Sequence, residues 1–408
     1  MRRTFLLLLA VATAACARRA DEPTPDLPPA DDGIVRFCCE TPDDGTVRAS
    51  GTSYLSRGSR YVCRMYYQGT LGSTALDTKV ESALKVNNDR GNSVYRQNTF
   101  DESAMLTDDY GFDRKGQLFY WQNRQQHAFV ALTDLHANYR DSAHYVPAFR
   151  DYRGTTEAVW NVYDLRTTRR YTMPGTAVTP EAESPVPAPT ADTFLKQPDP
   201  ARALTRMAPQ GATQETNRVH LTFEHCFAQV QVNVKPSADG SMGTSGDLTD
   251  PAGLLAVDLL GVSEEAYVPH TLADDGTLPP PDYKPVNVAD YTEAELAANR
   301  WGTAVQAFEM ETAAAGYLKS FHAIAYGRLQ AIRIYWREKE NPAIVHSSTH
   351  TVEEALADLQ SGMKYVFNFE LRRGTLAVIQ ARLEEWAIDS DSYRTDGSIV
   401  TTTLTTTP

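Results

Sequence analysis

The feature that most constrains the fold of this chain is a long succession of short, β-forming runs, many of them bounded by turn residues. They occupy residues 33–39, 60–67, 80–86, 93–97, 117–121, 126–132 and 158–165, and later 219–234, 254–260, 304–309, 321–325, 331–336, 365–371 and 375–386. Runs this short, with turns between them, favour sandwiches over alternating β-α-β units. The sequence therefore predicts an all-β protein with a few short helices.

The chain is long enough for two or three domains, since it has 408 residues, of which 42% are hydrophobic. A stretch with Pro198, Pro200, Pro209 and Gly211 separates the earlier runs from the later ones. We expect an N-terminal β-sandwich domain over residues 33–200, a linker over 201–217 and a C-terminal β-sandwich domain over 218–408.

Two details of the second half can be tested against a structure. The apolar phase changes within residues 219–234, so a bulge near Ala228 and Gln229 is expected to reset the register. Helical turns are expected after the capping boxes Thr292/Glu295 and Thr351/Glu354, the second helix ending at Gly362.

The beginning of the chain has the form of a lipoprotein export signal. Arg2 and Arg3 precede an apolar stretch, and Ala14 and Ala15 precede Cys16. The stretch is shorter than the about 20 residues that span a bilayer, which argues against a retained transmembrane anchor. An ordinary secretory signal with an incidental cysteine is the other alternative. We expect residues 1–15 to be removed, acyl chains such as palmitate on Cys16, and residues 16–32 to form a solvated tether.

The composition excludes several kinds of partner and chemistry. A formal net charge of −13 argues against a nucleic-acid or anionic-membrane surface. No HExxH, Walker loop, GxSxG or paired CxxC motif occurs, so no catalytic residue, cofactor or metal site is predicted. His127, His136 and His144 are interpreted as packed residues, and His225 as a core histidine that donates to a backbone carbonyl. A bridge between Cys63 and Cys226 is open.

The chain resembles the fimbrillins, the subunits of type V fimbriae of Bacteroidia-type bacteria. Four features carry the resemblance: the signal ending at Cys16, the strand and arginine within residues 34–48, the L-x-F-x-H-x-x-A-x-V pattern that begins at Leu221, and the ending from Gly362 to Trp386 with its Gly-x-x-Tyr strand and hairpin. They span nearly the whole chain in the family's order.

The resemblance implies a fold and a life cycle. Fimbrillins have two tandem transthyretin-like β-sandwich domains and are exported as lipoproteins to the outer membrane. An arginine-specific protease then removes the lipid and the first strand. Here Arg48 and Ala49 would flank the cut bond. Residues 33–39, in which alternation places Val35, Phe37 and Cys39 on one face, would be the strand that is lost. A strand from the next subunit would replace it.

The C-terminal residues 398–407 suit the role of that donor strand. They are uncharged and rich in β-branched residues, with Ile399, Val400 and Leu404 as the apolar members; Val400 and Leu404 would face the groove that the lost strand leaves. The alternative is a disordered threonine tail. The partners implied are other fimbrial subunits, the protease, the outer membrane and a host or bacterial surface ligand.

Several alternatives stay open at this point. Arg36 offers a second cleavage position, and Arg57, Arg60 and Arg64 are interpreted as exposed further ones. The chain could instead be a minor, tip or anchor subunit, the last of which keeps its lipid. A lipidated glycan-binding protein would use tryptophans as stacking platforms, the candidates being Trp121, Trp160, Trp301 and Trp336. An enzyme is the least favoured class.

Overall fold

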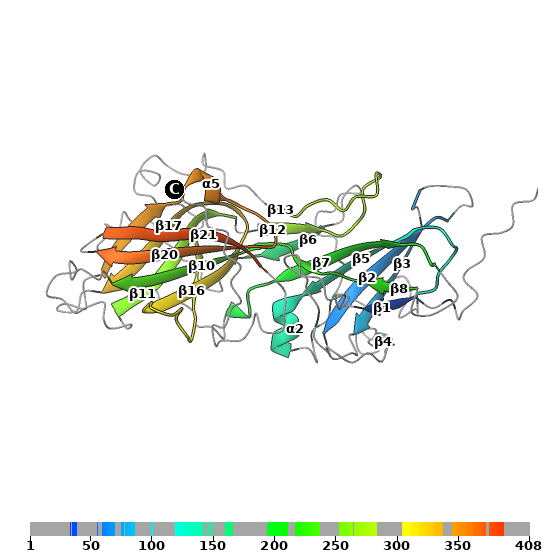
Figure 1. Cartoon of the computed structure of the whole chain (residues 1–408), viewed down its shortest axis with the longest axis horizontal. Helices are drawn as coiled ribbons and strands as arrows, with labels where there is room; N and C mark the ends of the chain where they lie inside the picture. The colour runs from blue at the N-terminus through cyan, green and yellow to red at the C-terminus, as the bar shows by residue number, and fades with distance from the viewer. Residues whose placement is uncertain are drawn as a thin grey trace, which may run out of the picture.

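The protein consists of two lobes placed end to end along the long axis of the molecule (Figure 1). The structure is a computed structural model and describes residues 33, 35–38, 55, 59–69, 75–76, 78–85, 99–100, 119–141, 145, 147, 149, 160–165, 194–210, 217–236, 253–263, 265–283, 304–337, 345–372 and 375–386. Strands dominate these residues, beside the short helices α2 (Leu135–Asp141) and α5 (Glu354–Ala357). The all-β prediction is confirmed. Neither of these helices is long and apolar enough to cross a membrane.

The C-terminal lobe contains two sheets that enclose one core. The first has the order β15-β16-β10-β20-β21, and the second has the order β14-β11-β17-β18 with β19 added beside β17. The strands of the first sheet are β10 (Ala228–Pro236), β15 (Phe308–Glu309), β16 (Lys319–Ala325), β20 (Met363–Arg372) and β21 (Thr375–Glu385). Those of the second are β11 (Leu254–Val262), β14 (Ala304–Gln306), β17 (Gly327–Arg337), β18 (Val345–Thr351) and β19 (Asp358–Leu359).

Alternation along the strands explains this core. In β10 the side chains of Val230, Val232 and Val234 are fully buried and belong to the cluster that the two sheets share. In β20, which runs parallel to β10, Phe367 lies opposite Val232 and joins the same cluster. Successive strand residues point to opposite faces, so each strand supplies every second residue to the core.

The N-terminal lobe contains a six-stranded sheet and a two-stranded one. The orders are β4-β3-β2-β5-β7-β9 and β1-β8. The larger sheet has β2 (Arg60–Tyr67), β3 (Thr78–Lys85), β4 (Thr99–Phe100), β5 (His127–Asp134), β7 (Pro200–Met207) and β9 (Glu224–His225). The smaller has β1 (Arg36–Cys38) and β8 (Arg218–His220). Tyr61, Cys63 and Met65 of β2 are in one hydrophobic cluster with residues of β1, β5 and β8.

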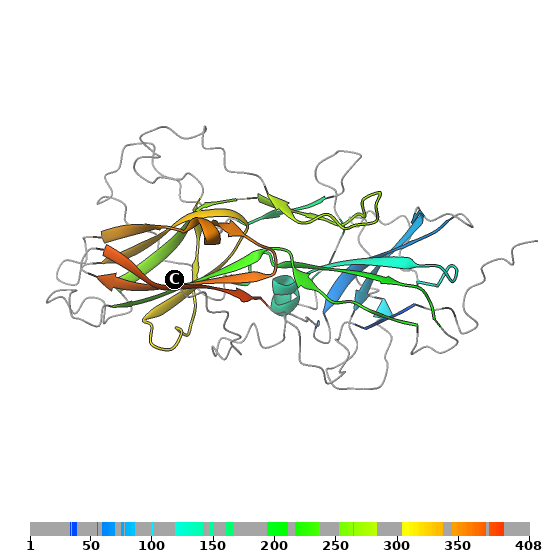
Figure 2. The same ribbon diagram turned by 45° about the horizontal axis from the view of Figure 1, so that its top comes forward.

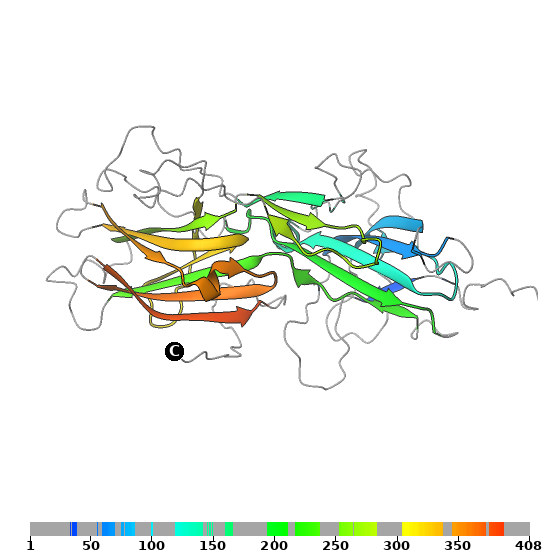
Figure 3. The ribbon, with the colours of Figure 1, turned by 90° about the horizontal axis from the view of Figure 1, so that it is seen from above.

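A third, three-stranded sheet joins the two halves of the chain. It has the order β13-β12-β6, formed by β6 (Trp160–Asp164), β12 (Glu265–Pro269) and β13 (Asp282–Tyr283). The connection between β12 and β13, residues 270–281, reaches from the C-terminal half over the six-stranded sheet, and we call it the strap (Figures 1 and 3). Its Leu272 and Leu278 pack on the side chains of Tyr66, Ala128 and Val130.

Arginines of the six-stranded sheet hold the strap and its ends. Arg202 Nη1 donates to the carbonyls of Pro269 (3.1 Å) and Pro279 (2.6 Å). Arg64 Nη1 donates to the carbonyl of His270 (2.7 Å), while Arg64 Nε pairs with Glu81 Oε1 at 2.5 Å. The sheet is therefore covered on both faces, which explains why every residue of β2 except Tyr67 is buried.

The junction between the lobes has its own apolar cluster, which includes Phe194, Phe227, Phe308 and Trp386. Helix α2 lies beside this junction (Figure 2). The side chain of Gln197 bridges it, because its Nε2 donates to the carbonyls of Leu165 (3.0 Å) and Ile324 (2.7 Å) and its Oε1 accepts from Ile324 N (2.7 Å). The side-chain amide of Gln197 therefore satisfies the main-chain N–H and C=O of Ile324, as a neighbouring strand would.

Three sequence expectations are corrected by these elements. Residues 201–207 belong to β7, so the segment expected to be a linker begins as a strand within the six-stranded sheet. Residues 219–234 are not one bulged strand: β8 and β9 pair within the N-terminal lobe and β10 in the C-terminal lobe, because the chain crosses between lobes at Cys226 and Phe227. Residues 304–309 likewise divide between β14 and β15, which lie in different sheets.

The helical turn expected after Thr351 is confirmed, but its predicted cap and its predicted end at Gly362 are wrong. Helix α5 has only four residues, its N-cap is Glu353 without a side-chain cap, and it ends at Ala357. Gly362 has φ +71° and instead forms the turn before β20. The Thr292/Glu295 box lies outside the described residues.

Candidate functional site: the seat of the first strand

The first strand, β1, is inserted between two parts of the N-terminal lobe. On one side it pairs in parallel with β8, so that Phe37 is opposite Val219. On the other side Val35 N donates to the carbonyl of Phe119 (2.8 Å), and Trp121 N donates to the carbonyl of Gly33 (2.9 Å). We call the surface formed by Phe119, Trp121, Phe129 and β8 the strand seat. Main-chain groups on both sides of the seat are satisfied by β1.

Two side chains, one in β1 and one directly before it, complete the core of the lobe. Val35 and Phe37 are 2% and 4% exposed and belong to the main N-terminal cluster. The Phe37 ring meets those of Phe119 and Phe129 edge-on, with centroids 5.5 Å apart in both pairs. The predicted face shared by Val35 and Phe37 is confirmed, and Cys39, expected on the same face, lies outside the described residues. Burial of both side chains contributes about 3–6 kcal/mol.

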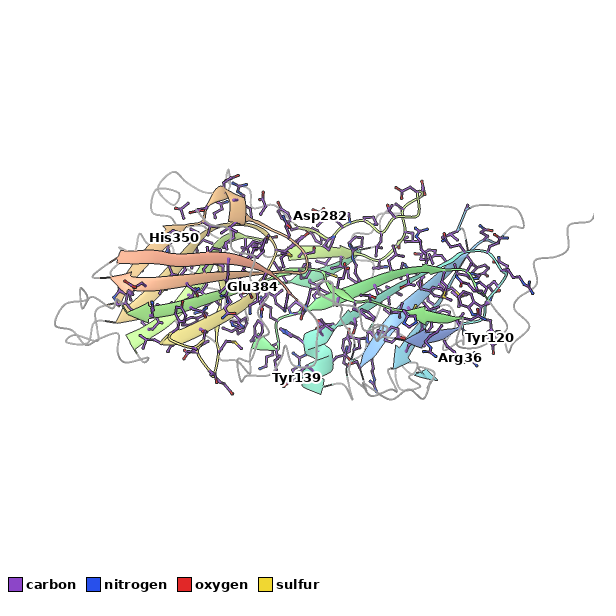
Figure 4. The ribbon with its side chains drawn as sticks, viewed as in Figure 1. Arg36, Tyr120, Tyr139, Asp282, His350 and Glu384 are labelled. Carbon is purple, nitrogen blue, oxygen red and sulfur yellow. The ribbon has the colours of Figure 1, made fainter. Side chains whose placement is uncertain are left out.

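The opposite face of β1 points away from this core. Arg36 is only half-buried and stands beside Arg218 in the parallel register. Figure 4 shows Arg36 and Tyr120 at the same end of the molecule. Tyr120 is 45% exposed. β1 thus combines a buried apolar face with an accessible polar one, the pattern of a strand that closes the outside of a sandwich.

His127 holds one rim of the strand seat in place. Its Nδ1 donates to the carbonyl of Gln125 (2.9 Å), and its Nε2 accepts from Gln122 N (3.3 Å), as a neutral imidazole does. Its ring meets the edge of Trp121, with centroids 5.0 Å apart. The interpretation of His127 as a packed residue is confirmed. Its support of the residues next to Trp121 is a role that no local sequence pattern indicates.

The arginines near the beginning of the chain differ in their accessibility. Arg60 and Arg64 are 5% and 3% exposed, so the expectation that they are exposed cleavage sites is wrong. Arg60 Nη1 donates to the carbonyl of Tyr145 (3.0 Å), and the Arg64 guanidinium lies 4.4 Å from the centroid of the Phe149 ring. Both are engaged by parts of the chain that are distant in sequence.

The predicted processing and assembly residues lie outside the described residues. These are Cys16, Arg48, Ala49, Ile399, Val400 and Leu404, together with Arg57 and His144. Trp386 is the last described residue before the C-terminal tail.

Two other sequence hypotheses are corrected. Cys63 and Cys226 are both free and buried, and they lie in different hydrophobic clusters, so they do not form the bridge that had been left open. Burial raises the pKa of the Cys226 thiol to about 12. Trp121 and Trp336 are 1% and 5% exposed and cannot serve as glycan platforms, while the side chains of Trp160 and Trp301 are outside the described set.

A buried ionisable cluster lies at the junction of the lobes. His225 Nδ1 donates to Asp199 Oδ1 (2.8 Å), and His136 Nε2 lies 3.9 Å from Asp199 Oδ2. His225 is therefore a core histidine as expected, but its acceptor is a carboxylate rather than a backbone carbonyl. Sequence reasoning missed Asp199, because nothing local links it to a histidine 26 positions later.

Burial controls the ionisation of this cluster. Asp134 Oδ1 accepts from Ala137 N (2.9 Å), but burial dominates and raises the pKa of Asp134 to about 6. Burial also lowers the pKa of His136. Within the described residues, no group of three or more histidine, cysteine, aspartate or glutamate residues is placed to hold a metal ion.

Comparison with known proteins gives structural similarity only. No family model and no curated protein sequence matches the chain. It is similar to the structure of a putative cell adhesion protein from Bacteroides ovatus (12% identity, 88% of this chain and 97% of that one, TM-score 0.46) and to another from Bacteroides uniformis (12%, 87% and 98%, 0.44). It is also similar to the C-terminally truncated tip fimbrial protein Mfa3 from Porphyromonas gingivalis (7%, 83% and 98%, 0.34).

Proposed function

We propose that the protein is a structural or adhesive subunit of cell-surface fimbriae that polymerises by exchange of its first strand. The observation that carries this proposal is the strand seat. Strand β1 and the residue before it, at the beginning of the chain, close the core of the N-terminal lobe with the side chains of Phe37 and Val35. The comparisons add no weight to it, because the similarity is low.

Loss of β1 would leave an edge that requires a replacement. Phe119, Phe129 and Val219 would lose their apolar neighbours, and Trp121 N and the carbonyl of Phe119 would lose their hydrogen-bond partners. Unpaired main-chain groups beside exposed apolar side chains favour the addition of a strand. An incoming strand needs apolar residues on one face, as β1 has.

The C-terminal tail meets this requirement. Val400 and Leu404 share one face of an extended strand, and the residues between them are threonines. A tail that enters the seat of the next subunit makes a head-to-tail contact that does not close on itself. Contacts of this type generate a filament.

The earlier steps of the proposal concern export and processing. Acyl chains on Cys16 deliver the precursor to the outer membrane, and an arginine-specific protease cuts between Arg48 and Ala49. The cut frees β1 from the rest of the chain. Arg36 is a poorer target, since its backbone is paired with β8. We propose the two lobes as two transthyretin-like sandwich domains, with the crossing at Cys226 and Phe227.

Two measurements test this function. Amino-terminal sequencing of protein from purified fibres should begin at Ala49, whereas a start at lipid-bearing Cys16 would refute processing and identify a retained anchor subunit. Deletion of residues 398–408 should abolish polymerisation while the monomer stays folded. Fibres that form normally without the tail would refute the donor-strand assignment.

Point variants refine the second test. Replacement of Val400 and Leu404 by threonine removes the apolar face and should strongly reduce polymerisation. The matched control, Thr401→Ser with Thr403→Ser, keeps that face and should polymerise normally.

A further inference from the structure

Trp386 connects the C-terminal tail to the body of the molecule. It follows β21 directly and precedes residues 387–408, which contain the proposed donor strand. Its ring lies flat on that of His225, with centroids 3.5 Å apart and planes 7° apart. Trp386 is 8% exposed, so a large side chain is buried where the tail begins.

The ring beneath Trp386 belongs to the N-terminal lobe. His225 is in β9, which pairs with β7 of the six-stranded sheet. Its Nδ1 donates to Asp199 Oδ1, and the adjacent Cys226 N donates to the carbonyl of Pro200 (2.8 Å). A charged acceptor strengthens the first of these hydrogen bonds and fixes the orientation of the imidazole. The surface on which Trp386 rests is therefore rigid.

The main chain of Trp386 is held by the C-terminal lobe. Trp386 N donates to the carbonyl of Gly362 (2.8 Å), and Gly362 N donates to the carbonyl of Phe227 (2.9 Å). The beginning of the tail is therefore bound by its backbone to the turn before β20 and by its side chain to β9. Force on the tail reaches both lobes at this residue.

This attachment matters because β21 alone would resist a pull on the tail poorly. β21 is the edge strand of its sheet, and its last residue, Glu385, is opposite Met363, the first residue of β20. A pull that lifts this end away from β20 would separate the pairs of the antiparallel ladder one after another rather than all together. The end pair would open first, and Trp386 stands directly beside it.

We propose that Trp386, stacked on His225, is the anchor that carries tension from the C-terminal tail into the N-terminal lobe and keeps β21 from peeling off β20. The inference rests on the proposed role of the tail as donor strand. In a fibre, the next subunit would hold the tail, so tension between neighbouring subunits would pass through the tail. Trp386 is a positioning residue in this scheme, and His225 is its support.

Hydrogen exchange in the monomeric full chain tests the anchor. Trp386→Ala should accelerate exchange of the amides of residues 383–386 by about tenfold or more, with a much smaller change at residues 376–378 at the other end of β21. Trp386→Phe, which keeps a stacked ring, should recover most of the protection. His225→Gln should reproduce the local acceleration while leaving Trp386 in place.

The matched control is Trp336→Ala, which removes a buried tryptophan from β17 of the same lobe. If Trp386 contributed only to general packing, Trp386→Ala would accelerate amide exchange equally at both ends of β21, as we expect for Trp336→Ala. That result, or normal protection of residues 383–386 in His225→Gln, would overturn the proposal.

Single-molecule extension of the full chain from its two ends gives a second readout. Release of the 11-residue β21 lengthens the chain by about 40 Å. We expect this step at a clearly lower force in Trp386→Ala than in the parent protein and the Trp336→Ala control. Equal forces in all three would refute the anchor. Both experiments use monomers, so they stand even if tail deletion fails to stop polymerisation and refutes the proposed function.

Discussion

The cores of the two lobes are completed in different ways. The core of the C-terminal lobe is built from side chains between Ala228 and Leu371, within one continuous part of the chain. The core of the N-terminal lobe contains side chains from Leu55 to Phe223, but it also needs Val35 and Phe37 from β1 and the residue before it, at the beginning of the chain. The first core is closed by strands from one continuous segment, whereas the second is completed by a strand from the beginning of the chain. Under the proposed function, this difference makes the N-terminal lobe the expected receiver in strand exchange.

Removal of residues 1–48 should have the largest effect and is the strongest test of the difference between the two cores. The N-terminal lobe should lose about 3–6 kcal/mol of unfolding free energy, the contribution of Val35 and Phe37, and the C-terminal lobe should change little. Hydrogen exchange resolved by lobe measures both effects. Added peptide 398–408 should restore part of the loss in a concentration-dependent manner. Equal destabilisation of both lobes would contradict the comparison, and deletion of residues 398–408 is the control that should affect neither.

A single substitution in β1 should give a somewhat smaller effect. Phe37→Ala removes the ring between Phe119 and Phe129 and should cost about 3–5 kcal/mol, confined to the N-terminal lobe. The matched variant Phe367→Ala in β20 should have a similar cost in the C-terminal lobe. Denaturant unfolding, with exchange to locate the change, measures both. If amide exchange accelerated in the same residues in both variants, the two cores would not be separate.

One buried group in each lobe should also give the unfolding free energy a pH dependence of opposite sign. The pKa of Asp134 is raised from 3.8 to about 6 by burial, so the folded protein keeps a proton that the unfolded chain has lost. Its contribution to stability falls as pH rises from about 4 to 6, by about 3 kcal/mol at most. The pKa of His322 in β16 is lowered from 6.5 to about 3, mainly by burial, so its contribution falls as pH drops through that range.

Asp134→Asn should remove the loss of unfolding free energy with rising pH, and His322→Gln should remove the loss with falling pH. Denaturant unfolding at pH 4, 5, 6 and 7 measures both. A variant whose pH profile is parallel to that of the parent protein would show that the substituted group does not produce the slope assigned to it.

The smallest effect is expected at Arg36. Its side chain is on the outer face of β1, beside Arg218, where like charges are unfavourable. Arg36→Thr should therefore change the unfolding free energy by less than about 0.5 kcal/mol. A loss above 1 kcal/mol would show that the polar face of β1 contributes to the seat as much as the apolar one, and that an uncharged donor strand would be a poor replacement.

Local patterns of apolar residues in the sequence predicted much of this fold. The run at 60–67 coincides with β2, and the alternation of Val35 and Phe37 gave the buried face of β1. The crossing at Cys226 and Phe227 could not be predicted, because apolar residues continue through it and nothing local shows that they enter different cores.

The failures at charged residues have a common cause. Arg60 and Arg64 are buried because the carbonyls of Tyr145 and His270 accept their hydrogen bonds, and these acceptors come close only after folding. The same holds for Asp199 beneath His225. Sequence pattern shows which faces are apolar, but it does not show which polar groups find distant partners.

The strap limits the order in which the protein can mature. Residues 270–281 cover the face of the six-stranded sheet formed by Tyr66, Ala128 and Val130, and Arg202 is satisfied only when this segment is present. The first lobe therefore cannot finish folding while the chain is still emerging in order from its N-terminus. It must wait until about two thirds of the polypeptide has been delivered. Until then the half-finished sheet exposes apolar surface, so the chain is most prone to aggregation during this interval.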